Sequence, residues 1–563
     1  MTFLCSRKAR RIQVVGIGIV TEFAMTRAIH ATLLLLLVAF CSSESDTSDL
    51  SISGRVTDIN QRSLPGVRVT ARHVKQRMSK TAFTDETGQY SIPALPPGIY
   101  TLRARRIGFD DQIISALEIS RSVKKDLILV PKEDFSDQMP ASDWFATIPF
   151  TSTQAREEFK LDCMVCHQIG SEQTRKARDH EQWADVIKWM RSLYAQAGES
   201  PAARQTDRER TASLSGWSKA GKPRFAPHPV AQGEAAHAII TEFDIGRSDS
   251  YCHDLEIDRS GRVWAVDIGQ DALYRLDPVT GTRTTYQIPA DDSPRINWSF
   301  SAYNTRVGPH SIEADQQGRM WITLAFGNKL AMFDPKTENF RVWKVPAPGI
   351  YPHTLRVDEN GEIWFTLYIS GHLGKFDPQE QRFTIYTPPT AGGTLYGIAI
   401  APDGAVWYSQ LYGQKIGRLD PRTGSIKEYK TPGLGPRRLE VDSKGIVWIP
   451  EYGAGMLARF DPATETFKEY ELPTGRVGEA PYALGIDRED KIWISGTISD
   501  TIMKFDPITV KFTVFPMPER VTFTREIEFD YSTGRMAVWT INSNDPPTHI
   551  ESKQPRVIRL ELR

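Results

Sequence analysis

Apolar and polar residues alternate with a period of two through most of this chain, in short runs separated by Gly, Pro, Asn and Asp. Between residues 51 and 131 the runs include ISGRVTD, GVRVTARHV, GQYSIPAL and KKDLILVP, with turns at Pro65-Gly66, Thr87-Gly88 and Pro97-Gly98. Such alternation is typical of half-buried strands, and seven short runs favour two packed sheets. We therefore predict a small antiparallel β-sandwich over residues 51–131.

Residues 236–563 repeat a unit in which a tryptophan precedes Leu-Asp-Pro or Phe-Asp-Pro. Six regular units and a less regular seventh carry Trp264, Trp321, Trp364, Trp407, Trp448, Trp493 and Trp539. These tryptophans are 57, 43, 43, 41, 45 and 46 residues apart, and the first interval holds an insertion around residues 291–306. A period near 43 residues with several short strands per unit predicts propeller blades. We expect a seven-bladed β-propeller whose ring is closed by a strand near residue 236, which joins the last blade.

Helical periodicity is confined to the segment between these two β regions. Residues 153–163 and 181–198 have helical patterns, and in the second Trp183, Ile187 and Met190 recur at spacings of three and four. Ser152 or Thr153 is expected to cap the first helix. Residues 199–235 have little periodicity and are expected to wrap or link. The fold class is therefore mainly β, with a small helical domain over residues 145–232 between a sandwich and a propeller.

Two families resemble these β regions. In the sandwich, the order G-x-V-x-D, P-G-V-x-V, T-D-x-x-G-x-Y, L-P-P-G-x-Y resembles the carboxypeptidase regulatory-like domain, a transthyretin-like sandwich, which implies a non-catalytic module. The repeat PHSIEADQQGRMWITLAFGNKLAMFDP resembles that of the virginiamycin B lyase family of streptogramin lyase-like propellers. The second resemblance is specific for the fold and much less so for activity.

The run Cys163-Met164-Val165-Cys166-His167 has the C-x-x-C-H pattern of a c-type haem attachment site. Two thiols on one helical turn can form thioethers with one porphyrin, and the adjacent histidine can bind the iron as proximal ligand. A thioredoxin-like pair would need a βαβ context, and a zinc site would need a second ligand pair nearby. We predict a cytochrome c-like domain over residues 145–232 with one covalent haem c.

The sixth iron ligand is less defined by the sequence. Met190 follows His167 by 23 residues, and Met/His ligation would raise the potential into a range that suits electron transfer. The alternatives are that Met190 only packs within the apolar stripe, that His180 binds the iron, or that the position is open.

The first 45 residues are typical of an export leader. Residues 28–40 form an apolar run of 13 after Arg27, which is short for a membrane span and suits a signal sequence. Met25 is an alternative start, Cys41 makes a lipoprotein possible, and an uncleaved anchor is the other alternative. We expect a periplasmic or otherwise exported protein, because c-type haem is attached outside the cytoplasmic membrane. Outside the leader and the haem motif only Cys252 remains, so no structural disulfide is expected.

The charge balance argues against two classes of partner. The 69 basic and 69 acidic residues give a formal net charge of zero, which favours neither nucleic acid nor an anionic membrane surface. Membrane association is expected only through the leader or a lipid anchor.

Equivalent positions of successive blades line the channel of a propeller. The residues that open the innermost strands are all able to form hydrogen bonds, and they are His253, His310, His353, Tyr396, Arg437, Tyr482 and Arg525. One interpretation is a mouth that binds a polar or anionic ligand. The other is that these side chains satisfy strand ends and hold channel water.

The lyase resemblance implies a histidine base and Mg²⁺ held by glutamates, in a Glu-Pro-His triplet followed by an acidic residue after the tryptophan of the same blade. This chain departs from that pattern, because blade six has Tyr482 in place of the histidine and Gly496 after its tryptophan. His310, His353 and Glu451 remain weak catalytic candidates if they converge across the channel. We do not expect Mg²⁺.

Three functional hypotheses follow from these features. The first is electron transfer between the haem and a redox partner protein or small molecule, coupled to ligand or partner binding at the channel. The second is a lyase-like enzyme that opens a cyclic or ester substrate at the channel, and the third is a non-catalytic binding or scaffold protein.

Overall fold

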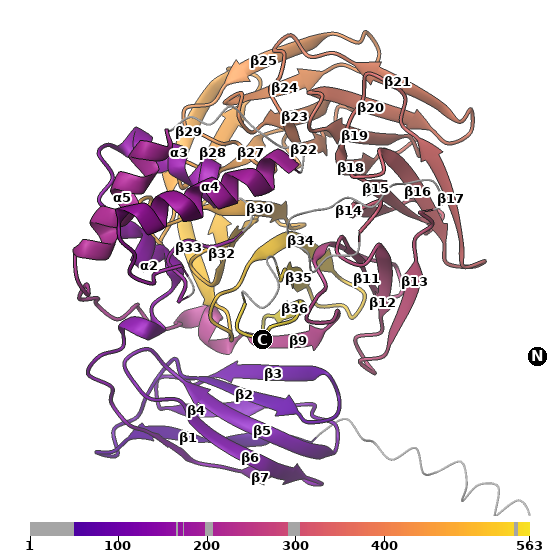
Figure 1. Cartoon of the computed structure of the whole chain (residues 1–563). Coiled ribbons are helices and arrows are strands. Elements are labelled where there is room, and N and C mark those ends of the chain that lie inside the picture. Colours follow the sequence, from indigo (N-terminus) through magenta and orange to yellow (C-terminus); the bar gives the residue numbers. More distant parts are fainter. Residues whose placement is uncertain (1–49, 165–166, 173, 197–205, 291–304, 545–549) are drawn as a thin grey trace, which may run out of the picture.

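The computed structural model describes residues 50–164, 167–172, 174–196, 206–290, 305–544 and 550–563 (Figure 1). The predicted leader with Cys41, the haem-motif residue Cys166 and most of the insertion around 291–306 lie outside these residues. The chain is mainly β, with an N-terminal sandwich, a helical segment and a propeller. No helix in the described ranges combines the length and apolar character that a membrane crossing requires.

The N-terminal sandwich contains two sheets. Its strands are β1 (Ile52–Asp58), β2 (Arg68–His73), β3 (Met78–Phe83), β4 (Gln89–Ile92), β5 (Gly98–Arg105), β6 (Gln112–Ile119), β7 (Val123–Lys124) and β8 (Leu127–Leu129). One sheet contains β4, β1, β7 and β8, and the other has the order β3-β2-β5-β6. The expectation of a purely antiparallel arrangement is wrong in one detail, because β1 pairs in parallel with both β7 and β8. The buried core includes Val56, Val69, Tyr100 and Leu102.

Seven four-stranded blades form the propeller within the described residues, as predicted. The first three are β10 (Cys252–Ile257), β11 (Val263–Asp267), β12 (Ala272–Leu276), β13 (Arg283–Gln287); β14 (Pro309–Ala314), β15 (Met320–Leu324), β16 (Lys329–Asp334), β17 (Asn339–Lys344); and β18 (Pro352–Val357), β19 (Ile363–Leu367), β20 (His372–Asp377), β21 (Arg382–Tyr386). Blades four to six are β22 (Leu395–Ile400), β23 (Val406–Gln410), β24 (Lys415–Leu419), β25 (Ile426–Lys430); β26 (Glu440–Val441), β27 (Val447–Glu451), β28 (Met456–Asp461), β29 (Thr466–Glu471); and β30 (Pro481–Ile486), β31 (Ile492–Gly496), β32 (Thr501–Asp506), β33 (Lys511–Pro516).

The blade tryptophans lie on the second strands, where they are fully buried between neighbouring blades. In five blades the indole Nε1 donates to an aspartate six residues earlier, at 2.8–3.0 Å; the acceptors are Asp258, Asp315, Asp358, Asp442 and Asp487. Blade four has Ala401 at this position. The repeated tryptophan therefore ties the second strand of most blades to the turn that precedes it.

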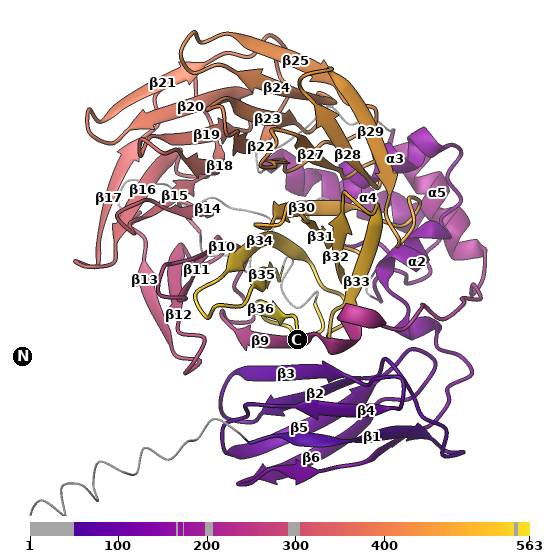
Figure 2. The same cartoon turned by 180° about the vertical axis from the view of Figure 1, so that it is seen from behind.

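The seventh blade combines the C-terminus with a strand from before the first blade. Its strands are β34 (Thr524–Asp530), β35 (Ala537–Asn542), β36 (Arg556–Glu561) and β9 (Ile239–Asp244), so the strand near residue 236 closes the ring as predicted. The outer edge of β9 is not open, because β9 also pairs with β3 of the sandwich. Blade seven and one sandwich sheet thus form a single eight-stranded sheet (Figures 1 and 2).

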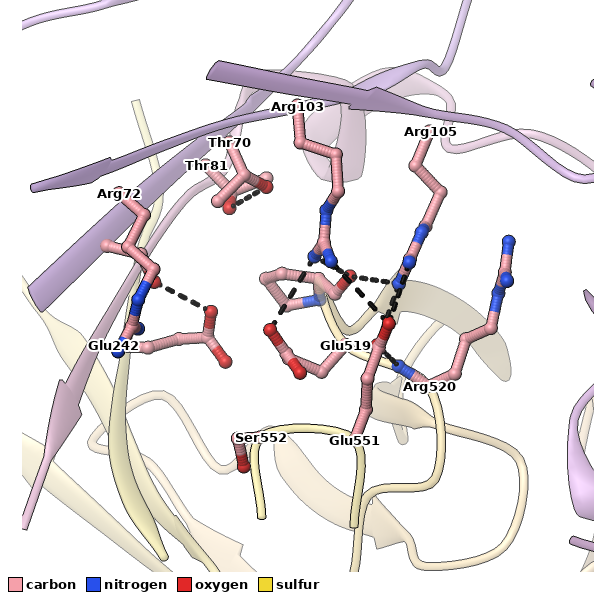
Figure 3. Close-up of polar contacts among 12 residues, drawn as sticks. Thr70, Arg72, Thr81, Arg103, Arg105, Glu242, Glu519, Arg520, Glu551 and Ser552 are labelled. Atoms are coloured by element: carbon pink, nitrogen blue, oxygen red, sulfur yellow. Dashed lines mark hydrogen bonds and ion pairs between the residues drawn. The ribbon is translucent and has the colours of Figure 1, made fainter. Parts of the chain in front are cut away.

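Ion pairs reinforce the contact between sandwich and propeller (Figure 3). Arg105 of β5 binds Glu551 at 2.7 Å and also Asp111 at 2.7 Å. Arg103 lies 3.5 Å from both Glu519 and Glu551. Because these groups come from both sides of the contact, the sandwich is held in a defined orientation.

The helical segment lies on one face of the propeller, over blades five and six (Figure 1). Its elements are η1 (Ser136–Gln138), α2 (Ala141–Ala146), α3 (Thr153–Cys163), α4 (His180–Gln196), α5 (Asp207–Lys219) and η2 (Gly233–His237). Ser152 caps α3 as predicted, since its side chain accepts from the backbone N–H of Ala155. The prediction that residues 199–235 only wrap or link is wrong for 207–219, which form α5.

Candidate functional site

The seven side chains that open the innermost strands meet at the centre of the propeller and contact one another in blade order. Ring centroids are 3.9 Å apart for His253 and His310, 4.0 Å for His310 and His353, and 4.2 Å for His353 and Tyr396. The guanidinium of Arg437 lies 4.9 Å from the Tyr396 ring and 3.9 Å from the Tyr482 ring, and that of Arg525 lies 4.8 Å from Tyr482. All seven are at most 5% exposed. We call this set the channel ring.

Hydrogen bonds connect the phenols of the channel ring to a histidine and an arginine. The hydroxyls of Tyr396 and Tyr482 are 2.6 Å apart, and Nη2 of Arg437 donates to Tyr396 at 3.0 Å. The Tyr482 hydroxyl also lies 3.2 Å from Nε2 of His253. Burial opposes ionisation of Tyr482, but Arg525 and Arg437 outweigh it and lower the pKa of this phenol. Burial raises the pKa of Tyr396, so the two bonded phenols differ in acidity.

Some polar atoms of the channel ring have no hydrogen-bond partner among the described residues. They are Nε and Nη1 of Arg437, Nε of Arg525 and Nδ1 of His310, and all four are buried. A buried polar atom without a partner is uncommon because it loses its contact with water and gains nothing in return. The ring therefore offers two cationic donors and one imidazole nitrogen to a group that the protein itself does not supply.

A second layer of charge lies three residues further along the inner strands. It contains Glu256, Glu313, Arg356, Glu440 and Glu528. Arg356 of blade three forms an ion pair with Glu440 of blade five, and its Nη1 lies 3.7 Å from Glu313. Burial, opposed by Arg356, raises the pKa of Glu313 to about 7 and that of Glu528 to about 8. This acidic layer was not predicted, although its signal is in the sequence: five of the seven blades carry a charged residue three positions after the residue that opens the inner strand.

The residues of the C-x-x-C-H motif lie at the end of α3 and just after it. Cys163 is the last residue of α3 and is half-buried, and burial raises the pKa of its thiol to about 12. His167 is buried, its Nδ1 lies 3.1 Å from the carbonyl oxygen of Gln168, and burial lowers its pKa. On α4, half-buried Met190 shares the helix face of buried Trp183, whereas His180 at the start of the helix is exposed.

Direct contacts join this motif to the channel ring. The Tyr452 hydroxyl donates to the carbonyl oxygen of Met164 at 2.5 Å, and the guanidinium of Arg437 lies 4.3 Å from the Tyr452 ring. Gln168 donates from Nε2 to the carbonyl oxygens of Thr497, at 2.8 Å, and Thr522. One apolar cluster contains Met164 and Trp183 together with Tyr396 and Tyr482. The motif segment therefore covers the channel mouth at which the ring residues meet.

The weak catalytic candidates do not all converge. His310 and His353 are neighbours in the channel ring. Glu451 ends β27 in blade five, and its Oε1 accepts from the backbone N–H of Gly433 in the same blade at 2.9 Å. No hydrogen bond or ion pair between Glu451 and either histidine is present among the described residues.

Comparison with known families agrees with this architecture. The model of the virginiamycin B lyase family matches residues 298–543, and that of the carboxypeptidase regulatory-like domain matches residues 51–129. The propeller is virginiamycin B lyase-like. A streptogramin B lyase structure is 20% identical with a TM-score of 0.50, and covers 59% of this chain and 100% of its own. A virginiamycin B lyase from Staphylococcus aureus is 18% identical with a TM-score of 0.49, over 58% of this chain and 100% of its own.

These likenesses describe the fold of the two β regions and leave the helical segment between them unmatched. Another similar structure is the extracellular domain of a putative hybrid two component system from B. thetaiotaomicron, at 17% identity and a TM-score of 0.42, covering 55% of this chain and 40% of its own. A sequence comparison with curated proteins found no match.

Proposed function

We propose that this protein is an exported c-type haem protein that transfers electrons at the mouth of its propeller channel. In this proposal Cys163 and Cys166 bind one haem covalently, His167 is the proximal iron ligand and Met190 is the candidate distal ligand. The observation that carries the proposal is the contact between the motif segment and the channel ring, through Met164, Tyr452 and Arg437. A haem held by this segment would lie beside the ring.

The residues present fit a haem. His167 is buried, half-buried Cys163 belongs to the apolar cluster around Met164 and Trp183, and burial keeps the imidazole neutral, which is the form that binds iron. The unpartnered Nε atoms of Arg437 and Arg525 suit the carboxylates that a haem carries. When bound, the haem would supply one-electron chemistry, and its potential would depend on the axial ligand and the charges nearby.

The channel ring would bind the electron donor or acceptor. Two arginines and three histidines at one level favour a polar or anionic small molecule, or an anionic group of a redox partner protein. The positive charges of Arg437 and Arg525 would also stabilise the reduced, less positive form of a haem bound beside them. Replacing Arg437 by Met is therefore expected to lower the haem potential, measured by potentiometric titration.

The covalent haem is tested by expressing the exported protein in cells that mature c-type cytochromes. We expect a haem spectrum that survives denaturation and that is lost in the Cys163→Ala/Cys166→Ala double variant. Cys252→Ala is the matched control, because this cysteine lies outside the motif, and it should keep the haem. A purified wild-type protein without covalent haem would refute the proposal.

The distal ligand is tested separately with Met190→Ala. If Met190 binds the iron, this variant loses the methionine–sulfur charge-transfer band and its haem potential falls. An unchanged low-spin spectrum would leave His180 or another ligand in that position.

The lyase alternative has less support, because Glu451 is bonded within its own blade and Tyr482 stands where the family pattern has histidine. It would gain support if the purified protein opened an ester substrate with a divalent metal, if His353→Ala abolished this activity, and if loss of the haem did not. A binding or scaffold role would remain if neither electron exchange nor turnover were detected.

A further inference from the structure

Two histidines and one aspartate form a compact group in the channel ring. One potential metal-binding atom from each of His253, Asp254 and His310 lies within 4.8 Å of the others. The imidazole rings have a centroid distance of 3.9 Å, and the three residues are 1%, 1% and 5% exposed. Because His253 and His310 come from adjacent blades, the propeller scaffold fixes their separation.

Both imidazoles are buried, and burial favours their neutral form. Burial lowers the pKa of His253 well below its usual value, and the nearby positive charge of Arg525 lowers it further. Burial also lowers the pKa of His310, and His253 adds to this effect. A transition metal binds the neutral form of an imidazole, through the electron pair of one ring nitrogen.

Hydrogen bonds orient the His253 ring, whereas the His310 ring has one nitrogen without a hydrogen-bond partner among the described residues. Nδ1 of His253 donates to Oδ1 of Asp254 at 2.7 Å, so Nε2 carries the electron pair. Nε2 accepts from the Tyr482 hydroxyl at 3.2 Å, a bond that a metal ion would replace. Asp254 is itself held by Nη2 of Arg438 at 2.7 and 2.8 Å. Nδ1 of His310 is buried without a hydrogen-bond partner among the described residues. A carboxylate behind a histidine is the usual support of a metal-binding imidazole, and a metal ion would complete the environment of His310.

We propose that His253 and His310 bind a divalent transition metal ion of the class to which Zn²⁺ belongs, with Asp254 as the residue that positions His253. Nitrogen ligands favour zinc and copper over Mg²⁺ or Ca²⁺, which take oxygen ligands. The site does not depend on the haem, and none of its residues belongs to the C-x-x-C-H motif.

The charges around the site favour an anion at an open coordination position. Asp254 and Glu526 both pair with Arg438 and offset its charge. Within the part of the chain that the structure describes, Arg437 and Arg525 of the ring contact phenol hydroxyls and aromatic rings and form no ion pair. A metal ion at this site therefore adds to the positive charge at the channel mouth. An anionic ligand bound to the metal would offset this excess charge.

The test measures metal content in the purified full chain, produced without a histidine tag. The protein is treated with EDTA, dialysed against Zn²⁺ and washed, and zinc and iron per chain are measured by mass spectrometry. We expect about one zinc per chain in the wild type and at least tenfold weaker zinc affinity in His310→Ala. The matched control is His237→Ala, because His237 is exposed on η2, and it should bind zinc like the wild type.

A second variant separates the loss of a metal ligand from a loss of folding. His310→Gln keeps much of the side-chain volume and polarity but is a poor ligand, and circular dichroism reports whether either variant is folded. Zinc should also raise the melting temperature of the wild type but not that of folded His310→Gln. Wild-type protein that binds no zinc, or a folded His310 variant that binds it as tightly, would overturn the site. The iron content of the same samples reports the haem independently, so the two proposals can fail separately.

Discussion

The contact between the motif segment and the propeller can be weakened by removing one oxygen atom, in the variant Tyr452→Phe. Both Tyr452 and Met164 are fully buried, and the lost hydroxyl donates to the carbonyl oxygen of Met164. Without this hydroxyl the Met164 carbonyl is buried with one hydrogen-bond partner fewer, which lowers the stability of the segment by about 1–3 kcal/mol. The aromatic ring stays in place, so the stacking of Arg437 on residue 452 is retained.

This cost should appear as easier local opening of the helical segment. Because about 1.4 kcal/mol corresponds to a factor of ten, peptides from α3 and residues 164–168 should exchange their amide hydrogens roughly 5 to 150 times faster. Hydrogen exchange followed by mass spectrometry measures this directly, and peptides from the sandwich should be unchanged. Tyr429→Phe is the matched control, because Tyr429 lies on the outer strand β25 and its hydroxyl contacts exposed Glu465 at 3.4 Å. Unchanged exchange in α3, or equal acceleration in the sandwich, would refute the reasoning.

Three further changes test the scaffold. Asp442→Ala should lower the free energy of unfolding in urea by about 1–3 kcal/mol, because the indole of Trp448 loses its acceptor. Ala401→Asp should raise it by up to about 1 kcal/mol, because it offers an acceptor to the indole of blade four. Equal unfolding free energies in the two variants would contradict a stabilising role for the indole–aspartate hydrogen bond. Arg105→Met should cost about 3 kcal/mol, seen as a lower melting temperature, since it removes the nearest guanidinium from Glu551 and Asp111 and leaves each with a more distant arginine at 3.5 Å. The pKa of Glu528 is raised to about 8 in the folded protein, so protonation of this carboxyl favours folding. This contribution to stability is complete below about pH 4.5 and is lost as the pH rises through about 8. The urea midpoint should therefore fall over this range, and it should fall less steeply in Glu528→Gln.

The parts of the structure that depend on local periodicity could be predicted from the sequence. The tryptophan repeat predicted the blades because each indole must fill the same position between neighbouring sheets, and equivalent positions then predicted which side chains open the inner strands. Helix α5 was missed although its signal was present, since Thr206 and Glu209 form a capping box at its start. The apolar residues of this helix recur too weakly at helical spacing for periodicity alone to predict it.

Contacts between distant segments could not be predicted in this way. The pairing of β3 with β9 joins two edge strands that are more than 150 residues apart, and nothing in either strand specifies the other. The cover of the channel by the motif segment depends likewise on single hydrogen bonds, such as those of Gln168 to Thr497 and Thr522. These residues have no repeat or motif that would mark them.

The arrangement around β9 explains why a non-catalytic sandwich can matter to the channel. β9 completes blade seven, whose inner strand β34 carries Arg525 of the channel ring. An uncovered β9 would leave an open sheet edge at the point where the ring closes, and open edges invite pairing with other chains. The sandwich covers this edge through β3, and Arg72 binds Asp244 at the end of β9 at 2.6 Å. The sandwich therefore stabilises the closure of the propeller, and through that closure it helps to fix the position of Arg525, one of the two arginines of the channel ring.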